Sequence, residues 1–86
     1  MKQVVLDGAV LDRTSLHNTL SRELAFPEWY GRNLDALYDC LGDLCEETEL
    51  TLRNWDAWSD QHYADRLLRV MRDAAAENDN LTISVE

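Results

Sequence analysis

The most informative stretch of this chain is PEWYGRNLDALYD, residues 27–39. Three aromatic residues flank a glycine-containing turn in this stretch. A helix is predicted to begin at Asn33, a residue type typical of helix N-caps, and to carry Asp35 and Asp39 one turn apart. Aromatic rings beside charged groups are typical of protein-binding surfaces. The stretch therefore predicts a helix-borne site for a cationic protein surface rather than a catalytic centre.

The chain is strongly acidic. Its formal net charge is −9 at pH 7, from 8 Lys and Arg against 17 Asp and Glu, and its pI is near 4.4. Such a surface repels phosphate backbones, because nucleic-acid affinity rests largely on cationic contacts to phosphates. The same charge attracts basic proteins and accelerates their encounter. We therefore expect no direct nucleic-acid partner and a basic protein partner.

Length and local sequence restrict the class of protein further. A chain of 86 residues with 45% hydrophobic content predicts one globular domain over residues 1–86. Only three apolar residues run together before Asp7, so neither a signal peptide nor a membrane span is predicted. Cys40 and Cys45 have no histidine nearby for a zinc site and are poorly spaced on a helix for a disulfide. Two free thiols in a reducing cytoplasm are expected.

Hydrophobic patterning predicts three strands. An apolar run over residues 4–6 predicts a buried strand before an Asp-Gly turn, and apolar residues alternate with polar ones over 50–54 and 81–85. At least one helix separates each pair of strands, which favours parallel pairing through right-handed crossovers. We therefore predict an α/β fold, a small three-stranded parallel sheet packed with three to four helices.

The helices are predicted from periodicity and from their end signals. The first begins near Thr14 or Ser15, both plausible N-caps, and is stopped by Pro27. A third helix runs from about Asp60 to a turn at 78–80, after a loop or single helical turn over 55–58. The second helix begins at its Asn cap, and its apolar stripe consists of Leu34, Leu37, Tyr38, Leu41 and Leu44.

Two groups of carboxylates stand out on these helices. Asp35, Asp39 and Asp43 recur every four residues, a spacing at which like charges repel by about 0.2–0.5 kcal/mol per pair. Asp73 and Glu77 lie in the last turns of the final helix, where negative charge opposes the helix dipole. Either these acids form solvated faces with ordinary surface pairing, or the two helices pack side by side. In the second case they form a joint anionic cluster that a cationic partner compensates.

The aromatic residues of the turn have two possible roles. One of the adjacent pair Trp29 and Tyr30 can face the core, and Tyr30 is the stronger candidate for it. The remaining rings, with Tyr38 one turn inside the helix, are candidates for contact with a partner. Gly31 is expected either to supply a turn conformation or to let a partner backbone approach closely.

No pattern typical of an enzyme is present. His17 and His62 lie 45 residues apart without ligand partners at metal spacing, so both are expected to be surface histidines. The chain has no phosphate-binding glycine loop, no nucleophile elbow and no zinc-protease motif. Paired carboxylates can act as acid and base only in a concave pocket, which a chain this short seldom builds. Trp55 and Trp58 are expected to cover a sheet edge. No enzymatic activity, cofactor or metal is predicted.

The central stretch resembles the barstar family of intracellular ribonuclease inhibitors. Flanking matches over residues 16–25 and 70–83 extend the resemblance to the whole chain. The resemblance implies a compact α/β domain with a parallel three-stranded sheet that blocks the active site of a small, basic, secreted ribonuclease. It also implies a one-to-one complex and a free monomer. The residues that carry it are Pro27, Glu28, Trp29, Tyr30, Gly31, Asn33, Leu34, Asp35, Ala36, Leu37 and Asp39.

The resemblance also implies roles for individual residues. Asp39 would occupy the site of the substrate phosphate, Asp35 would hold a further cation, and Trp29 would stack on the catalytic imidazole. Asp73 would add a peripheral ion pair. The rest of the contact would come from Gly31, Asn33, Leu34 and Tyr38.

Several positions depart from the founding inhibitor of the family. Its tyrosine at the stacking position is Trp29 here, its helix tryptophan is Tyr38, a further tryptophan is Leu44, and a glutamate is the shorter Asp73. Stacking remains possible with a changed shape, and the peripheral acid reaches less far. An alternative function is therefore an immunity or antitoxin module for a different basic toxin.

Overall fold

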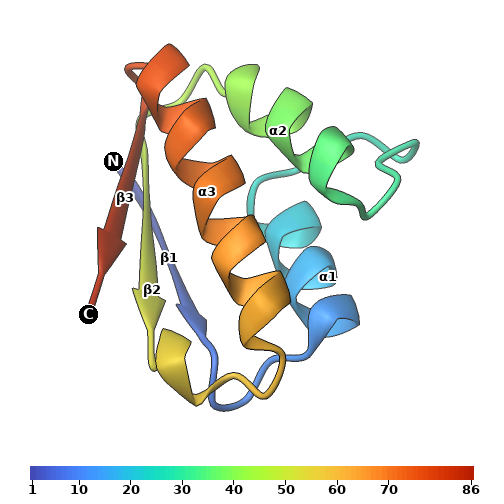
Figure 1. The fold of residues 1–86 in the computed structure, drawn as a ribbon. Helices are drawn as coiled ribbons and strands as arrows, with labels where there is room; N and C mark the ends of the chain where they lie inside the picture. Colours follow the sequence, from blue (N-terminus) through green and yellow to red (C-terminus); the bar gives the residue numbers. More distant parts are fainter.

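The computed structural model describes residues 1–86, which form one three-stranded sheet, three α-helices and one short 3₁₀ helix (Figure 1). The strands are all parallel and lie in the order β1-β2-β3. The predicted α/β class, with three parallel strands and three to four helices, is therefore confirmed. The elements along the chain are β1 (Lys2–Asp7), α1 (Arg13–Glu23), α2 (Leu34–Gly42), β2 (Thr48–Arg53), η1 (Trp55–Ala57), α3 (Gln61–Glu77) and β3 (Leu81–Val85).

The helices cover one face of the sheet, and the other face is open to solvent (Figure 1). Side chains of a strand point alternately to the two faces. Val4 and Leu6 of β1 accordingly face the core, together with Leu50 and Leu52 of β2. Val5 is 51% exposed, so the prediction of a fully buried run over residues 4–6 is wrong. Val5 is exposed because no helix covers the outer face of the sheet, to which every second residue of the strand points.

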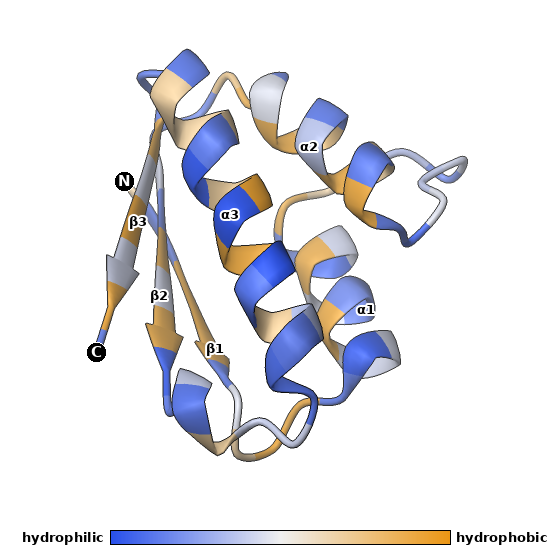
Figure 2. Cartoon of the chain, viewed as in Figure 1, coloured by the Kyte–Doolittle hydropathy of each residue, from blue (hydrophilic) through white to orange (hydrophobic).

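Each α-helix begins at a side-chain cap. Asp12, rather than Thr14 or Ser15, caps α1, and its carboxylate accepts from the backbone N–H of Ser15 at 2.7 Å. The sequence prediction chose the wrong member of a run of capping residue types. Asn33 caps α2, as predicted, and Asp60, near which the third helix was expected to begin, caps α3. Polar and apolar residues follow one another around all three helices, as expected for helices with one buried face (Figure 2).

The end of α1 also differs from the prediction. The helix ends at Glu23, and Ala25 has a left-handed backbone with φ of 53°. The chain therefore leaves the helix before it reaches Pro27. Leu16 and Leu20 of this helix are buried, as is its C-cap Leu24.

Helices α2 and α3 pack side by side, which confirms the arrangement that a joint acidic cluster requires (Figure 1). Buried Leu37 and Leu41 of α2 share the core with Leu67 of α3. Hydrogen bonds of one side chain then connect the ends of the two helices. The amide of Asn78 donates to the carbonyl oxygens of Leu41 at 2.9 Å and Leu44 at 3.0 Å. The end of α2 is thereby held against the end of α3.

The segment after β2 closes the core at the other end of the sheet. Trp55 and Trp58 are both 6% exposed, and their ring centroids lie 5.1 Å apart. The indole N–H of Trp55 donates to the carbonyl oxygen of Ala64 at 3.2 Å. These rings were expected to cover a sheet edge, and they are members of the core cluster itself. None of the helices combines the length and the apolar character that a membrane span requires.

Candidate protein-binding site

The turn before α2 separates its two adjacent aromatic residues. The backbone N–H of Tyr30 donates to the carbonyl oxygen of Pro27 at 3.0 Å, which closes the turn. Trp29 is 75% exposed, whereas Tyr30 is 3% exposed. Of the two alternatives left open by the sequence, Tyr30 faces the core and Trp29 faces solvent. Tyr30 therefore offers a partner its backbone only.

Tyr30 is anchored by a buried histidine. Its hydroxyl lies 2.6 Å from Nδ1 of His17, and Nε2 of the same ring lies 2.8 Å from the hydroxyl of Tyr63. His17 thus connects α1, the turn and α3. Burial lowers the pKa of His17, and the charges of nearby arginines lower it further. Burial also raises the pKa values of both tyrosines.

The expectation that His17 is a surface residue is wrong, since it is 2% exposed. Its spacing contained a usable signal. His17 follows Leu16 and lies three residues before Leu20, so it belongs to the same apolar face of α1. A polar ring on such a face must find hydrogen-bond partners, because an unpaired buried polar group is costly. The sequence did not show which residues would supply them.

The residues just before α2 serve the helix start. The side-chain oxygen of Asn33 accepts from the backbone N–H of Ala36 at 2.8 Å, and its amide group faces the Gly31 carbonyl at 3.5 Å. Gly31 does not have a left-handed backbone, so it does not supply the unusual turn conformation considered above. Arg32 does, with φ of 53°. A Cβ on Gly31 would lie 2.9 Å from the Asn33 amide, so a glycine leaves room for the capping side chain.

Helix α2 and helix α3 bring three of the predicted acids together. Asp35 and Asp39 from α2 and Asp73 from α3 line one open hollow of about 400 Å³. Tyr38, which is 36% exposed, and half-buried Leu34 also border it. The remaining two acids lie elsewhere. Asp43 borders a different hollow, beside Trp29, and Glu77 lines none of the hollows of the structure.

The three acids of the shared hollow, here called the acidic groove, have no ion-pair partner within the chain. The ion pairs of the structure join Arg13 to Asp60, Arg22 to Glu23 and Arg53 to Glu86. Ordinary surface pairing of Asp73 with neighbouring arginines on α3 is therefore absent. No ion pair within the chain therefore offsets the mutual repulsion of these carboxylates.

Trp29 stands at the rim of a second, more apolar hollow of about 380 Å³. Phe26, Pro27 and Leu44 supply much of its apolar lining, and Asp43 borders it. Cys40, also in this lining, is buried, Cys45 is exposed, and neither forms a disulfide. Burial raises the pKa of the Cys40 thiol, and the neighbouring carboxylates raise it further. A raised pKa keeps that thiol protonated and unreactive.

Fold and site together define a small α/β protein that presents an acidic groove and an exposed tryptophan on and beside one helix. No group of three or more His, Cys, Asp or Glu side chains is placed to hold a metal ion. The sequence model of the family described as Barstar (barnase inhibitor) matches residues 1–86. The chain belongs to this family.

A relative supports the same assignment. The Bacillus subtilis (strain 168) protein named "Putative ribonuclease inhibitor YrdF" is 37% identical to this chain over 91 residues, an alignment that covers 100% of both. The chain is thus a member of a family of inhibitors and not an enzyme. Its family and this relative support ribonuclease inhibition in general.

Proposed function

We propose that this protein inhibits a small, basic, secreted ribonuclease by placing α2 and the preceding turn in the active site of the enzyme. The observation that carries the proposal is the acidic groove, in which Asp35, Asp39 and Asp73 converge and none of the three forms an ion pair within the chain. A ribonuclease active site presents several cations to hold a phosphate. The two surfaces are therefore complementary in charge.

Asp39 would act as a mimic of the substrate phosphate. It is exposed on α2, and the rigid helix holds it in place before the partner arrives. Preorganisation reduces the entropy lost on binding, and charge-assisted hydrogen bonds to arginine are among the strongest in proteins. Asp35, one turn earlier, would hold a second cation. Asp73 would add a peripheral ion pair from α3.

The aromatic contacts would flank this charged centre. Trp29 has most of its ring in solvent and would stack on the catalytic imidazole of the ribonuclease. Tyr38 lies beside the acidic groove and would cover its rim. Gly31, Asn33 and Leu34 would complete the contact, with the backbone of Tyr30. Asp43 and Glu77 lie outside the acidic groove and would contribute mainly through long-range attraction.

The cellular setting follows from the same proposal. A cell that secretes a ribonuclease needs protection from enzyme that remains inside, so the inhibitor would act in the cytoplasm as an antitoxin. We expect one inhibitor to bind one enzyme, because a single groove is built by a single chain. We expect the free protein to be a monomer.

The experiment is a titration of a panel of small basic secreted ribonucleases with the wild-type protein and with Asp39→Ala. Stoichiometric one-to-one inhibition is expected for at least one enzyme, and a loss of at least about 30-fold in affinity for the variant, as for a hot-spot residue. Asp56→Ala is the matched control, because it also removes an exposed carboxylate, from η1, which follows β2.

Three outcomes separate the alternatives. Inhibition that collapses only in Asp39→Ala supports the function and the site together. Inhibition that survives the loss of Asp39 contradicts the proposed site. Inhibition of no member of the panel contradicts the function, and the search for a partner then moves to basic toxins of another class, against which the protein would act as an immunity module.

A further inference from the structure

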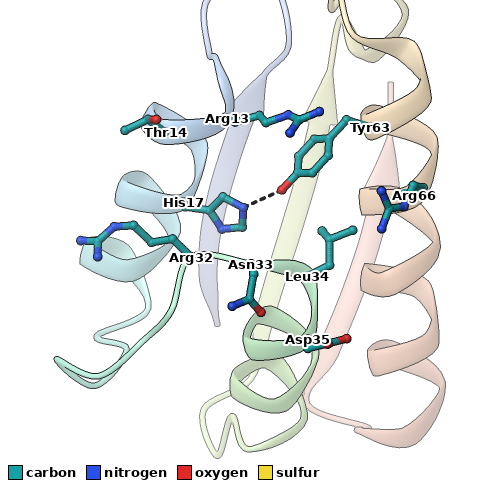
Figure 3. A pocket seen from close by; sticks show the side chains of 9 residues that line it. All are labelled: Arg13, Thr14, His17, Arg32, Asn33, Leu34, Asp35, Tyr63 and Arg66. Atoms are coloured by element: carbon teal, nitrogen blue, oxygen red, sulfur yellow. Dashed lines mark hydrogen bonds between the residues drawn. The ribbon is translucent and has the colours of Figure 1, made fainter.

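A cationic hollow of about 490 Å³ lies beside the binding turn (Figure 3). Three arginines from three separate segments border it: Arg13 at the start of α1, Arg32 in the turn and Arg66 on α3. Figure 3 shows them on different sides of the His17–Tyr63 hydrogen bond. A chain with net charge −9 thus places three of its eight cationic side chains around one opening. Asp35 is the only carboxylate in its lining.

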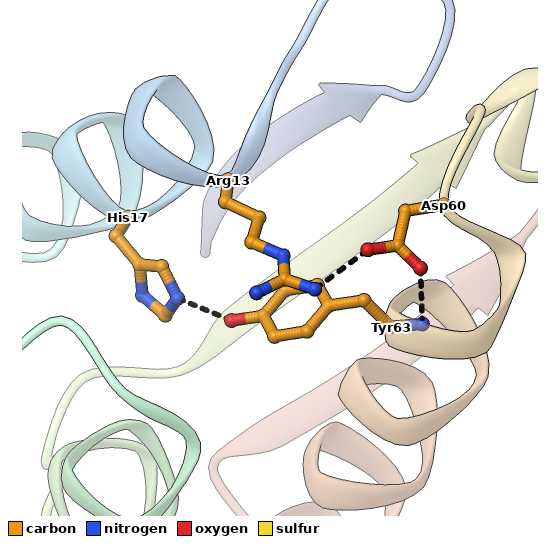
Figure 4. Close-up of polar contacts among 4 residues, drawn as sticks. All are labelled: Arg13, His17, Asp60 and Tyr63. Carbon is orange, nitrogen blue, oxygen red and sulfur yellow. Dashed lines mark hydrogen bonds and ion pairs between the residues drawn. The ribbon is translucent and has the colours of Figure 1, made fainter.

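One of these arginines is fixed in place. Nη2 of Arg13 pairs with Asp60 at 2.6 Å, and the guanidinium lies 4.0 Å from the centre of the Tyr63 ring (Figure 4). The carboxylate of Asp60 also accepts from the backbone N–H of Tyr63 at 3.0 Å. Asp60 thus holds together Arg13 and Tyr63, which both line the hollow.

The other two arginines keep unused hydrogen-bond donors. Arg32 donates through Nε to the side-chain oxygen of Asn18 at 2.8 Å, which leaves both of its terminal nitrogens without a partner in the chain. Arg66 is exposed and takes part in none of the ion pairs or side-chain hydrogen bonds of the structure. A guanidinium group has five N–H donors arranged to fit a carboxylate. Both side chains are thus available to an anionic group.

The three arginines affect the pKa values of the same two buried groups, His17 and Tyr63. The charges of Arg32 and Arg13 lower the pKa of His17 beyond the effect of burial. The charges of Arg13 and Arg66 oppose the rise that burial imposes on the pKa of Tyr63. His17 and Tyr63 are hydrogen-bonded to each other at the floor of the hollow. All three cations therefore act on the same small volume.

We propose that this hollow receives a carboxylate side chain of the inhibited ribonuclease, an inference that rests on the proposed function. The hollow adjoins the acidic groove, and Leu34 and Asp35 border both. A partner seated on the acidic groove therefore also faces Arg32 and Arg66. A uniformly basic partner surface would be repelled there, whereas a negative group of the partner at this point would be attracted. The arginines then select among basic ribonucleases rather than bind all of them.

The test compares Arg32→Gln and Arg66→Gln with the control Arg22→Gln, using the member of the ribonuclease panel that the wild-type protein inhibits most strongly. Arg22 is also an exposed arginine, and it lines none of the hollows. Loss of a positive charge from an uninvolved site leaves affinity for a basic enzyme unchanged or slightly raised. We expect Arg22→Gln to behave in this way and the other two variants to weaken inhibition by about tenfold each.

The control is expected to leave affinity unchanged or slightly raised and the two test variants to lower it, so the outcomes can be distinguished. If Arg66→Gln matches Arg22→Gln, the inference is wrong even though wild-type inhibition and the Asp39→Ala loss uphold the function. Arg66→Gln is decisive because an exposed helix position without partners can be changed without harm to the fold, whereas Arg32 has a left-handed backbone. If the wild type inhibits no ribonuclease, the function and this inference fail together.

A second measurement identifies the partner group. Acidic residues around the ribonuclease cleft are changed singly to their amides and combined with Arg66→Gln in double-mutant cycles. One acidic residue is expected to couple to Arg66 by about tenfold in affinity and to show no coupling to Arg22. The absence of coupling for every acidic residue would overturn the inference.

Discussion

Trp29 and Tyr30 are adjacent in sequence and opposite in environment, so they separate binding from stability. Trp29→Ala is expected to weaken inhibition at least about tenfold, because an exposed aromatic residue in a proposed interface contributes mainly to binding. The free energy of unfolding should change by no more than about 0.5 kcal/mol, the usual range at exposed positions. Inhibition titration and urea unfolding of the same preparation measure the two effects.

Tyr30→Phe is the matched variant with the reverse expectation. It removes the hydroxyl next to Nδ1 of His17 and leaves a buried polar atom without a partner. The free energy of unfolding should fall by about 1–3 kcal/mol. The affinity of the folded variant for the ribonuclease should change little. An equal loss of binding in both variants would contradict the division between an exposed and a buried aromatic residue.

His17 predicts a loss of stability in mild acid. Its folded pKa is lowered from 6.5 by burial and by nearby arginines, so below pH 6.5 the unfolded chain binds a proton that the folded chain does not. The unfolding free energy should therefore fall as the pH drops through this range. Urea unfolding between about pH 7 and pH 5 should show a shallower fall for His17→Gln than for the wild type. The control His62→Gln changes an exposed histidine, and its unfolding free energy should depend on pH as that of the wild type does. If the unfolding free energies of all three proteins fall in parallel, His17 is not the cause of the loss of stability.

The sequence predicted residue roles best where an isolated rule applied. It identified the Asn33 cap and favoured Tyr30 as the core aromatic. It misplaced His17, because the partners of a buried histidine come from segments 13 and 46 residues away. It also considered Gly31 for the turn conformation that Arg32 adopts. Glycine adopts a left-handed backbone more readily than other residues, but other residues also adopt it. The surrounding structure decides which residue of a turn does so.

At the scale of elements, the start of α2 controls how the acidic groove is presented. Asn33→Ala removes the side-chain oxygen that accepts from the Ala36 N–H at 2.8 Å. The free energy of unfolding should fall by about 1 kcal/mol, the usual cost of a lost N-cap. Asn33→Asp keeps an acceptor and places a negative charge at the helix N-terminus, so it should retain stability. Urea unfolding of both variants checks this, and equal losses would show that the cap is not the stabilising feature.

The elements themselves were predictable, with errors confined to their boundaries. The final helix and strand follow the predicted pattern closely because each combines strong periodicity with clear end residues. The start of α1 was misplaced by a run of three possible caps, Asp12, Thr14 and Ser15. Strand β2 begins at Thr48, two residues before the predicted position, because pairing with β1 and β3 extends it beyond its alternating residues. Neighbouring strands, rather than local sequence, set that boundary.

At the scale of the whole molecule, net charge should govern the rate of encounter. A protein of charge −9 is attracted over long distances by a basic enzyme, and salt screens this attraction. The association rate constant should fall at least about tenfold between about 0.02 and 0.5 M salt, with a smaller change in the dissociation rate constant. Stopped-flow mixing measures both. A salt effect confined to dissociation would contradict electrostatic steering.

The overall architecture was predictable because helices separate the strands and parallel pairing then follows. The open outer face of the sheet was not, since the apolar residues at 4–6 suggest burial on both sides. Nor did the sequence show that Asp35, Asp39 and Asp73 would share a hollow while Asp43 and Glu77 would not. That grouping depends on the position of α2 against α3, which long-range contacts such as those of Asn78 fix.

The central claim is that Asp39 and its neighbours occupy the phosphate site of a ribonuclease. Competition with a mononucleotide that binds this site tests the claim most directly. In calorimetric titrations of the inhibited enzyme, the apparent Kd of the protein should rise in proportion to mononucleotide concentration, as expected for mutually exclusive binding. An apparent Kd that stays constant while the enzyme is saturated with mononucleotide would mean that both bind together. The acidic groove would then act somewhere other than the active site.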